Sequence, residues 1–104
     1  MKFEWDTEKA EINERKHKIT FLESCYVFSD QYLLTMFDIG HSEYEDRWIT
    51  MGQIPNGKIL VVNYVYRKRN EEEFIRIISS RKAAKSEVKQ YVTRREGKIN
   101  AERI

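Results

Sequence analysis

The sequence is poor in the residues that build metal sites and disulfide frameworks. Among 104 residues there are one cysteine and two histidines, so Cys25 has no partner for an intramolecular disulfide. A lone cysteine favours a reducing compartment, and we therefore expect a cytoplasmic protein. His17 and His41 lie far apart and lack the spacing of a zinc motif, which predicts that the chain has no metal site.

Long apolar runs and nucleotide-binding loops are also missing. No stretch approaches the roughly 20 apolar residues that span a bilayer, and residues 1–6 lack the apolar core of a signal peptide. With four glycines and one proline, the chain contains no GxGxxG, Walker-type or Gly-x-Ser-x-Gly motif. We therefore expect no membrane partner and no cofactor.

Charged residues are abundant, at 35% of the chain, but they are unevenly placed around a net charge of only +2. Residues 1–66 carry seven basic and eleven acidic side chains, a net charge of −4. Residues 67–98 carry eleven basic and five acidic side chains, a net charge of +6. Such asymmetry is typical of a site for a polyanion or an acidic partner, although a solvated helix face gives the same pattern.

The first third of the chain predicts a short strand followed by two helices. Residues 3–5 alternate between apolar and polar side chains, and Asp6 offers an N-cap for a helix that runs to about His17. This helix has so little apolar surface that its polar side chains must either hold it in place or serve a functional site. Thr20 and Glu23 have the spacing of a capping box for a second, short helix.

The rest of the chain predicts strands and a final helix. Asn56-Gly57 is a strong hairpin signal because both residues tolerate a positive φ. Ser79 or Ser80 is placed to cap the last helix and Gly97 to end it, with residues 93–104 as a frayed tail. The expected strands cover residues 33–38, 45–53, 59–67 and 74–79. This order predicts one α+β domain over residues 1–104, with N-terminal helices, an antiparallel β-meander and a C-terminal helix packed on the sheet.

Arginines recur at the ends of the predicted strands. Arg47 falls in the predicted strand 45–53, and Arg67 closes the strand 59–67. Arg76 lies in the strand 74–79, and Arg81 begins the predicted final helix. If the four converge on one sheet face, they form a phosphate-binding concavity, because each guanidinium can give bidentate hydrogen bonds to phosphate. Arg81 and Lys82 would also stand near a helix N-terminus, where free backbone N–H groups favour an anion.

These residue types suit RNA cleavage without a metal, in which the 2′-hydroxyl attacks the adjacent phosphorus. The reaction needs a base, an acid and cations around the phosphorane. Glu45 is a candidate base because the predicted strand puts it on the same face as Arg47. The other candidates are Lys16 or His17 as the proton donor, Arg76 or Arg81 as the stabilising cation, and Tyr64, Tyr66 or Tyr91 as platforms for bases. A surface charge pair for Glu45 and Arg47, and ordinary sheet positions for Tyr64 and Tyr66, remain open as alternatives.

Three ordered motifs stand out along the chain, and together they cover about residues 2–92. The first motif is Trp5-Asp6-x-x-Lys9-Ala10-x-x-Asn13-x-x-Lys16-His17-x-Ile19-x-Phe21. The second is Glu45-x-Arg47 followed by Gly52. The third is Arg76-Ile77-Ile78-Ser79-Ser80-Arg81-Lys82-Ala83, with Glu87 and Tyr91 behind it.

These three motifs resemble the signatures of the BrnT family of RelE-like toxins. The resemblance implies a two-layer RelE-like fold and a ribonuclease activity that arrests translation. It also implies a BrnA-like ribbon-helix-helix antitoxin, a hetero-oligomer with it, and repression of the toxin's own operon through operator DNA bound by the antitoxin. The catalytic candidates are then Glu45, Arg47, Arg76, Arg81 and His17. The RNA-binding candidates are Lys16, Arg67, Lys82, Lys85 and Tyr91.

Two alternatives to an active enzyme remain at this point. One is a catalytically inactive member that only holds the antitoxin. The other is a small nucleic-acid-binding module that places Lys82, Lys85 and Lys89 on phosphates, which predicts steeply salt-dependent binding.

Overall fold

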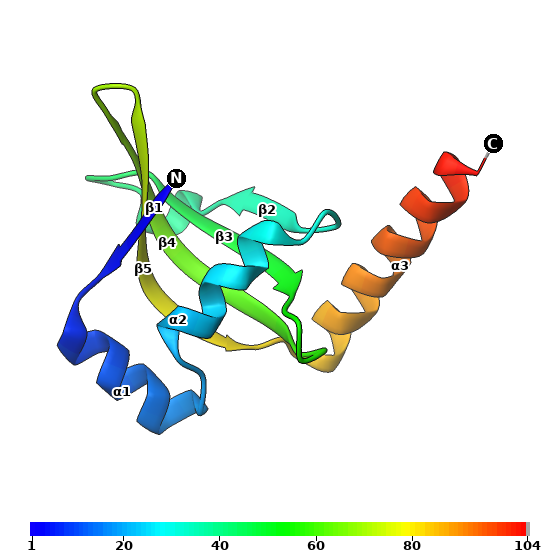
Figure 1. Ribbon diagram of the computed structural model, residues 1–104, viewed down its shortest axis with the longest axis horizontal. Coiled ribbons are helices and arrows are strands. Elements are labelled where there is room, and N and C mark those ends of the chain that lie inside the picture. The colour runs from blue at the N-terminus through cyan, green and yellow to red at the C-terminus, as the bar shows by residue number, and fades with distance from the viewer. Residues whose placement is uncertain (104) are drawn as a thin grey trace.

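A computed structural model describes residues 1–103 as one five-stranded sheet with helices against both faces (Figure 1). The strand order is β1-β5-β4-β3-β2. Strands β2 to β5 form the expected antiparallel meander, and β1 adds to the β5 edge in parallel, so the sheet is mixed. The elements are β1 (Lys2–Trp5), α1 (Thr7–His17), α2 (Phe21–Ser24), the 3₁₀ helix η1 (Cys25–Ser29), β2 (Leu34–Phe37), the 3₁₀ helix η2 (Ile39–His41), β3 (Arg47–Gln53), β4 (Ile59–Arg69), β5 (Glu72–Lys82) and α3 (Lys85–Glu102).

Both predicted helix starts are confirmed. The Asp6 side chain accepts the backbone N–H of Lys9 at 3.0 Å. Thr20 and Glu23 form the reciprocal capping box, with distances of 3.0 Å to the Glu23 amide and 2.8 Å to the Thr20 amide. These contacts satisfy donors that the first turn of a helix leaves free, which is why the chain turns sharply into each helix.

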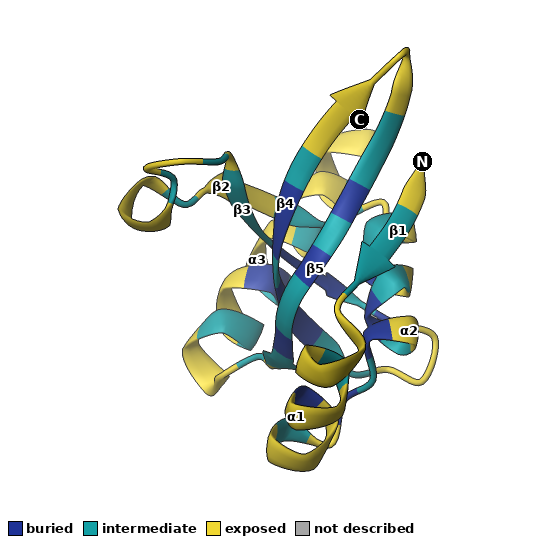
Figure 2. Ribbon diagram, turned by 90° about the vertical axis from the view of Figure 1, so that its left-hand side faces the viewer, coloured by how far each residue is buried: buried dark blue, intermediate teal, exposed yellow. Residues whose placement is uncertain are grey.

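Two apolar clusters form the core, one on each face of the sheet. The larger cluster joins the middle of β4 and β5 to the segment Ile19–Val27 and holds Leu60, Val62, Ile75 and Ile77. The smaller cluster lies on the opposite face and joins Met51 and Val61 to α3. Figure 2 shows buried residues in the middle of β4 and β5, whereas the outer end of this hairpin is exposed. One face of the sheet is therefore covered by α1, α2 and η1, and part of the other face by α3.

Helix α1 is attached to the sheet through a buried amide. Parallel pairing with β1 reaches only as far as Ile77 on β5. At Ser80, just beyond that point, Asn13 Nδ2 donates to the carbonyl at 2.9 Å and Asn13 Oδ1 accepts the amide at 3.1 Å. The same Nδ2 donates to the carbonyl of Ile19 at 3.2 Å. One side chain thus takes the place of a neighbouring strand, which explains how so polar a helix is held.

The start and the end of the last helix differ from the prediction. Strand β5 continues to Lys82, so Ser79 and Ser80 are strand residues and cap no helix. Helix α3 begins at Lys85, and the Ala84 amide is satisfied by Glu87 Oε1 at 2.7 Å. The helix also continues past Gly97 to Glu102, so the predicted helix end and frayed tail were wrong for residues 93–102. Position 104 of that tail lies outside the described residues.

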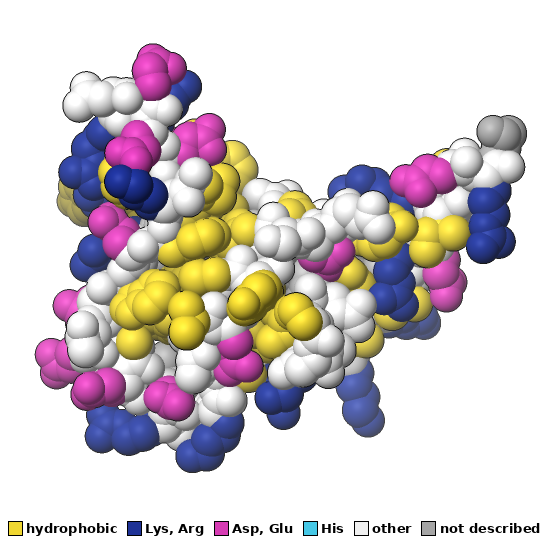
Figure 3. All heavy atoms as spheres, viewed as in Figure 1, with side chains coloured by type: hydrophobic (Ala, Val, Ile, Leu, Met, Phe, Trp, Pro, Cys, Tyr) yellow, Lys and Arg dark blue, Asp and Glu magenta, His cyan; other side chains and the backbone are white. Residues whose placement is uncertain are grey.

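Helix α3 contacts the sheet as far as Arg95 and then runs away from the body of the molecule (Figure 1). Tyr91 is 1% exposed, and its hydroxyl donates to Asp30 Oδ2. Arg95 donates to Gln53 Oε1 at 3.1 Å and lies over the Tyr91 ring, 5.4 Å from its centroid. The second half of α3 is mostly exposed and carries basic side chains (Figure 3). No helix within residues 1–103 has the length and apolar character that crossing a bilayer needs.

Raising the pH is expected to release α3. Burial, and next to it the hydrogen bond to Asp30, raise the pKa of Tyr91 from its ordinary value of 10.0 to about 12. A group with a raised folded pKa stabilises the fold below its ordinary pKa and loses that contribution as the pH rises through the folded value. Near-ultraviolet circular dichroism should therefore change between about pH 10 and pH 12 together with tyrosinate absorbance. A Tyr91→Phe variant with an identical transition would contradict this assignment.

Gly52→Ala is expected to lower the free energy of unfolding by about 2 kcal/mol, the usual cost of overpacking a core. A Cβ at Gly52 would lie 3.0 Å from both Cγ1 and the carbonyl oxygen of Val27, and 3.3 Å from Asp30 Oδ2. Gly97→Ala is the matched control, because a Cβ there meets no atom within 4 Å and alanine favours the helix. Urea unfolding of both variants measures the difference, and equal stability of the two would contradict the close packing at Gly52.

Two smaller differences concern turns. Glu45 lies in the loop before β3 and not in the strand, because β3 begins only at Arg47. In the β3–β4 turn Gly57 has a φ of +92°, whereas Asn56 is not among the described residues with a positive φ. The Asn56 side chain contributes instead by accepting the amide of Lys58 at 2.9 Å.

Candidate active site

Strand pairing places four arginines on one face of the sheet. Arg47 pairs with Val65 on β4, and Val65 pairs with Arg76 on β5. Directly paired residues point to the same side, so Arg47 and Arg76 flank Val65 in one row. Arg67 follows Val65 by two residues on β4, and Arg81 pairs with Val61, so both share this side. We call the surface formed by Arg47, Arg67, Arg76 and Arg81 the arginine face.

Two adjoining hollows lie beside Arg47 of the arginine face. One hollow of about 240 Å³ is lined by Asp38, His41, Arg47 and Asn63. A second, of about 200 Å³, is lined by α1 residues that include Lys16 and His17. Ile78 and Ser79 line both hollows, and we call the two hollows together the groove.

A β-bulge shapes the floor of this groove. Asn63 pairs with Ser79 while the next residue, Tyr64, pairs with Ile77, so Ile78 has no opposite partner. A bulge bends its strand and redirects side chains. Asn63 Nδ2 donates to Ser79 Oγ at 3.0 Å, which places two small polar groups on the floor between the basic ends of the groove.

Glu45 holds two of the arginines. Its Oε1 accepts from Arg47 Nε at 3.2 Å and from Arg47 Nη2 at 3.1 Å. Its Oε2 accepts from Arg67 Nη2 at 3.3 Å. Both carboxylate oxygens are thus occupied by guanidinium donors, and this arrangement orients the two arginines toward each other.

The other two arginines differ in how firmly they are paired. Arg76 has only a loose contact with Glu4, at 3.9 Å from Nη1 to Oε1. Arg81 makes a bidentate contact with Glu87 at 2.7 and 3.0 Å. This hydrogen bonding raises the pKa of Arg81 and lowers the pKa of Glu87. Arg76 therefore keeps more of its hydrogen-bonding capacity for a ligand, whereas Arg81 is engaged in anchoring the start of α3.

Sequence reasoning missed two polar residues of the groove, Asp38 and His41. His41 Nδ1 lies 3.1 and 3.0 Å from the two carboxylate oxygens of Asp38. Their spacing of three residues, shortly before Glu45 and Arg47, was the available signal, but it stood in a segment without strand or helix periodicity. In the sequence, His41 stood out only as a possible metal ligand.

The structure separates the predicted site residues into three places. Glu45 lies with Arg47, Arg67 and Arg76 at one end of the arginine face, and Lys16 and His17 line the hollow beside α1. Arg81 shares the arginine face but lies farther along, with Lys82 at the end of β5 and not at a helix N-terminus, while Lys85 begins α3.

The three tyrosines that were predicted to stack on RNA bases pack in or against the core clusters. Tyr91 belongs to the smaller core cluster, which leaves no ring face for a base, so the predicted RNA contact at this residue was wrong. Tyr64 belongs to the larger cluster, and its hydroxyl pairs with Thr50 Oγ1 at 2.8 Å. Tyr66 packs against the same cluster as a partly buried residue. An aromatic side chain on a strand therefore served the core here, in line with the alternative left open for Tyr64 and Tyr66.

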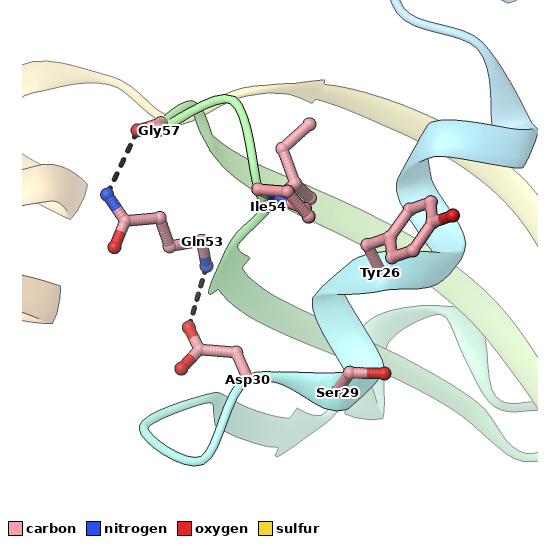
Figure 4. Close-up of a pocket in the computed structure, with 7 residues that line it drawn as sticks. Tyr26, Ser29, Asp30, Gln53, Ile54 and Gly57 are labelled. Carbon is pink, nitrogen blue, oxygen red and sulfur yellow. Dashed lines mark hydrogen bonds between the residues drawn. The ribbon is translucent and has the colours of Figure 1, made fainter.

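A larger hollow, of about 420 Å³, lies between η1 and the β3–β4 turn (Figure 4). Its polar groups bind one another: Asp30 Oδ2 accepts the Gln53 amide at 2.7 Å, and the Gln53 side chain donates to the Gly57 carbonyl at 3.0 Å. These contacts fix the turn. Within residues 1–103 no group of three or more His, Cys, Asp or Glu side chains is arranged to hold a metal ion.

Comparison with known proteins gives a family and a fold. The model of a protein family described as "Ribonuclease toxin, BrnT, of type II toxin-antitoxin system" matches residues 5–87. The crystal structure of the Brucella abortus ribonuclease toxin BrnT is similar with a TM-score of 0.55 and 22% identity, covering 82% of this chain and 99% of that one. No curated protein matches the sequence. Because the family model spans most of the chain, the protein belongs to the BrnT family of ribonuclease toxins of type II toxin–antitoxin systems.

Proposed function

We propose that this ribonuclease toxin is a metal-independent endoribonuclease whose active site is the groove on the arginine face. The observation that supports this most is the row formed by Arg47, Val65 and Arg76. Two strand spacings, roughly 10 Å, separate the Cα atoms of the two arginines. Their long side chains can therefore converge on one phosphate above Val65 and give it several charge-assisted hydrogen bonds.

In this mechanism the RNA supplies its own nucleophile. The 2′-hydroxyl attacks the adjacent phosphorus, and Arg47 and Arg76 stabilise the charge that builds on the phosphorane oxygens. Arg67 binds a neighbouring phosphate, with Lys82 and Lys85 as more distant contacts. We assign the protonation of the leaving 5′-oxygen to Lys16 or His17, which line the adjoining hollow.

The role proposed for Glu45 changes with the structure. Both of its oxygens already accept hydrogen bonds from Arg47 and Arg67. A carboxylate has about four lone-pair sites, and three of them are used here by guanidinium donors. We therefore assign Glu45 the positioning of the two arginines, and not the removal of the 2′-proton.

Family membership implies a protein antitoxin, and we propose that it is a BrnA-like ribbon-helix-helix protein. It would form a hetero-oligomer with the toxin in the cytoplasm, bind operator DNA and repress the shared operon. The basic groove favours an acidic antitoxin segment, so the association rate should fall as salt is raised. An association rate that does not depend on salt would contradict electrostatic steering.

Expression of this chain alone in bacteria tests the function. Growth arrest with breakdown of total RNA is expected, and Arg47→Ala combined with Arg76→Ala should relieve both effects. An inactive antitoxin-binding module is the second candidate, because each arginine of the face already has a carboxylate neighbour. Normal growth with a folded product would favour that candidate.

A further inference from the structure

The pair of Asp38 and His41 has the geometry of a proton-transfer couple. A carboxylate can only accept hydrogen bonds, so the short contact to Asp38 places the proton of the neutral imidazole on Nδ1. Nε2 is then left with a free lone pair. The Asp38 side chain is 19% exposed and the His41 side chain 70% exposed, so the ring reaches into the groove while its partner stays mostly covered.

The backbone around this couple is held in place by four hydrogen bonds. Ser42 Oγ donates to the Asp38 carbonyl at 2.6 Å and accepts the amide of Arg47 at 3.0 Å. The Asp38 amide donates to the Arg47 carbonyl at 2.8 Å, and the His41 amide to the Asp38 carbonyl at 3.2 Å. The turn that carries His41 is therefore tied to the first residue of β3, the same residue whose side chain lies on the arginine face.

We propose that His41 is the general base of the ribonuclease reaction and that Asp38 is its positioning residue. The inference rests on the proposed function of the groove. His41 Nε2 takes the proton of the 2′-hydroxyl as its oxygen bonds to phosphorus, and the phosphorus–O5′ bond breaks. The 5′-oxygen leaves from the opposite side of the same phosphorus and takes a proton from Lys16 or His17, which line the adjoining hollow. The products are a 2′,3′-cyclic phosphate and a 5′-hydroxyl.

The surroundings of His41 favour this role over that of a surface ion pair. The ring shares one hollow with Arg47, Asn63 and Ser79, and a second hollow with Glu43, Tyr44, Glu45 and Arg47. Together with Asp38 and Tyr64, these residues include every titratable or charged group that lines the two hollows with His41. Arg47 lines both, so a phosphate bound by this guanidinium would lie beside the imidazole. Histidine is also the side chain that most readily exchanges a proton near neutral pH.

The test measures cleavage of an RNA oligonucleotide that contains the bond cut fastest by the wild-type protein. His41→Ala should lower kcat by roughly 10²–10⁴-fold with little change in KM, the usual contribution of acid–base catalysis. The rise of wild-type kcat with pH through the histidine range should disappear in this variant. Asp38→Asn should give an intermediate loss. Ile39→Ala, an 84% exposed neighbour in the same turn, is the matched control and should keep full activity.

A second substrate separates base from acid. In a 5′-bridging phosphorothiolate the leaving sulfur needs no proton. This substrate therefore restores the cleavage rate of variants that lack only the general acid. His41→Ala should stay slow on this substrate, whereas His17→Ala should recover. Recovery of His41→Ala, or full activity of this folded variant on normal RNA, would overturn the base assignment while leaving the ribonuclease intact. If wild-type protein produces no cyclic phosphate, both this inference and the proposed reaction fail.

Discussion

Replacing both Arg47 and Arg76 by alanine should lower kcat/KM for RNA cleavage by at least about 10³-fold. Loss of one group that stabilises transition-state charge typically costs about 10²–10³-fold, and groups that act together are not additive. The two residues share one row of the sheet, and neither side chain is buried in the core. The variant should therefore keep the thermal unfolding temperature of the wild-type protein to within a few degrees.

The matched control removes the same charge elsewhere. Arg94→Ala with Lys98→Ala changes two cations on the exposed half of α3, away from the groove. This control should keep its activity and lose only affinity that comes from general attraction to RNA. Equal losses in both double variants would show that net charge, and not the Arg47–Arg76 row, determines cleavage.

Asn13→Ala should produce the largest loss of stability, about 3 kcal/mol. The amide of Asn13 is 6% exposed and satisfies the N–H and C=O of Ser80 as well as the carbonyl of Ile19. Each buried backbone group left without a partner costs about 1–3 kcal/mol. For a domain of this size the unfolding temperature should fall by roughly 15 °C. Calorimetry or circular dichroism at a fixed protein concentration measures the effect.

Two companion variants show whether the amide itself is responsible. Asn13→Asp keeps the shape but cannot donate to the carbonyls of Ser80 and Ile19, so it should destabilise the protein as much as alanine does. Ile12→Ala, on an exposed side chain next to Asn13, should change stability little. If Asn13→Asp proved as stable as the wild-type protein, the hydrogen bonds to Ser80 and Ile19 would not explain how α1 is held.

Local signals predicted much of the fold. The caps at Asp6 and Thr20 were predictable because a cap depends on residues three positions apart. The helix start at Ser79 or Ser80 was not, because β5 is extended by contacts distant in sequence. Ser80 Oγ accepts from Ser24 Oγ at 2.6 Å, and its backbone pairs with Asn13. Long-range pairing here overrode a serine's local preference for a helix cap.

The candidate site was predictable where strand periodicity applies. The strand pairing puts Arg47 beside Arg76 in one row. Alternation alone would put Arg76 and Arg81, five residues apart, on opposite faces, and only the β-bulge brings them to the same face. His41 lies in a 3₁₀ turn, where no periodicity of the sequence predicts which way a side chain points. The burial of Tyr91 could not be predicted either. The sequence around a helical tyrosine looks the same whether its ring packs in the core or is exposed to stack on an RNA base. Asp30, the hydrogen-bond partner of Tyr91, lies 61 residues away.

The most direct test of the account is the chemistry of the products when purified protein acts on RNA in excess EDTA. A matched RNA carries a 2′-O-methyl group at the preferred cleavage position. The account predicts cleavage of the unmodified RNA to a 2′,3′-cyclic phosphate and a 5′-hydroxyl, and no cleavage at the methylated position. Cleavage that stops in EDTA, or that proceeds at the methylated position, would contradict it.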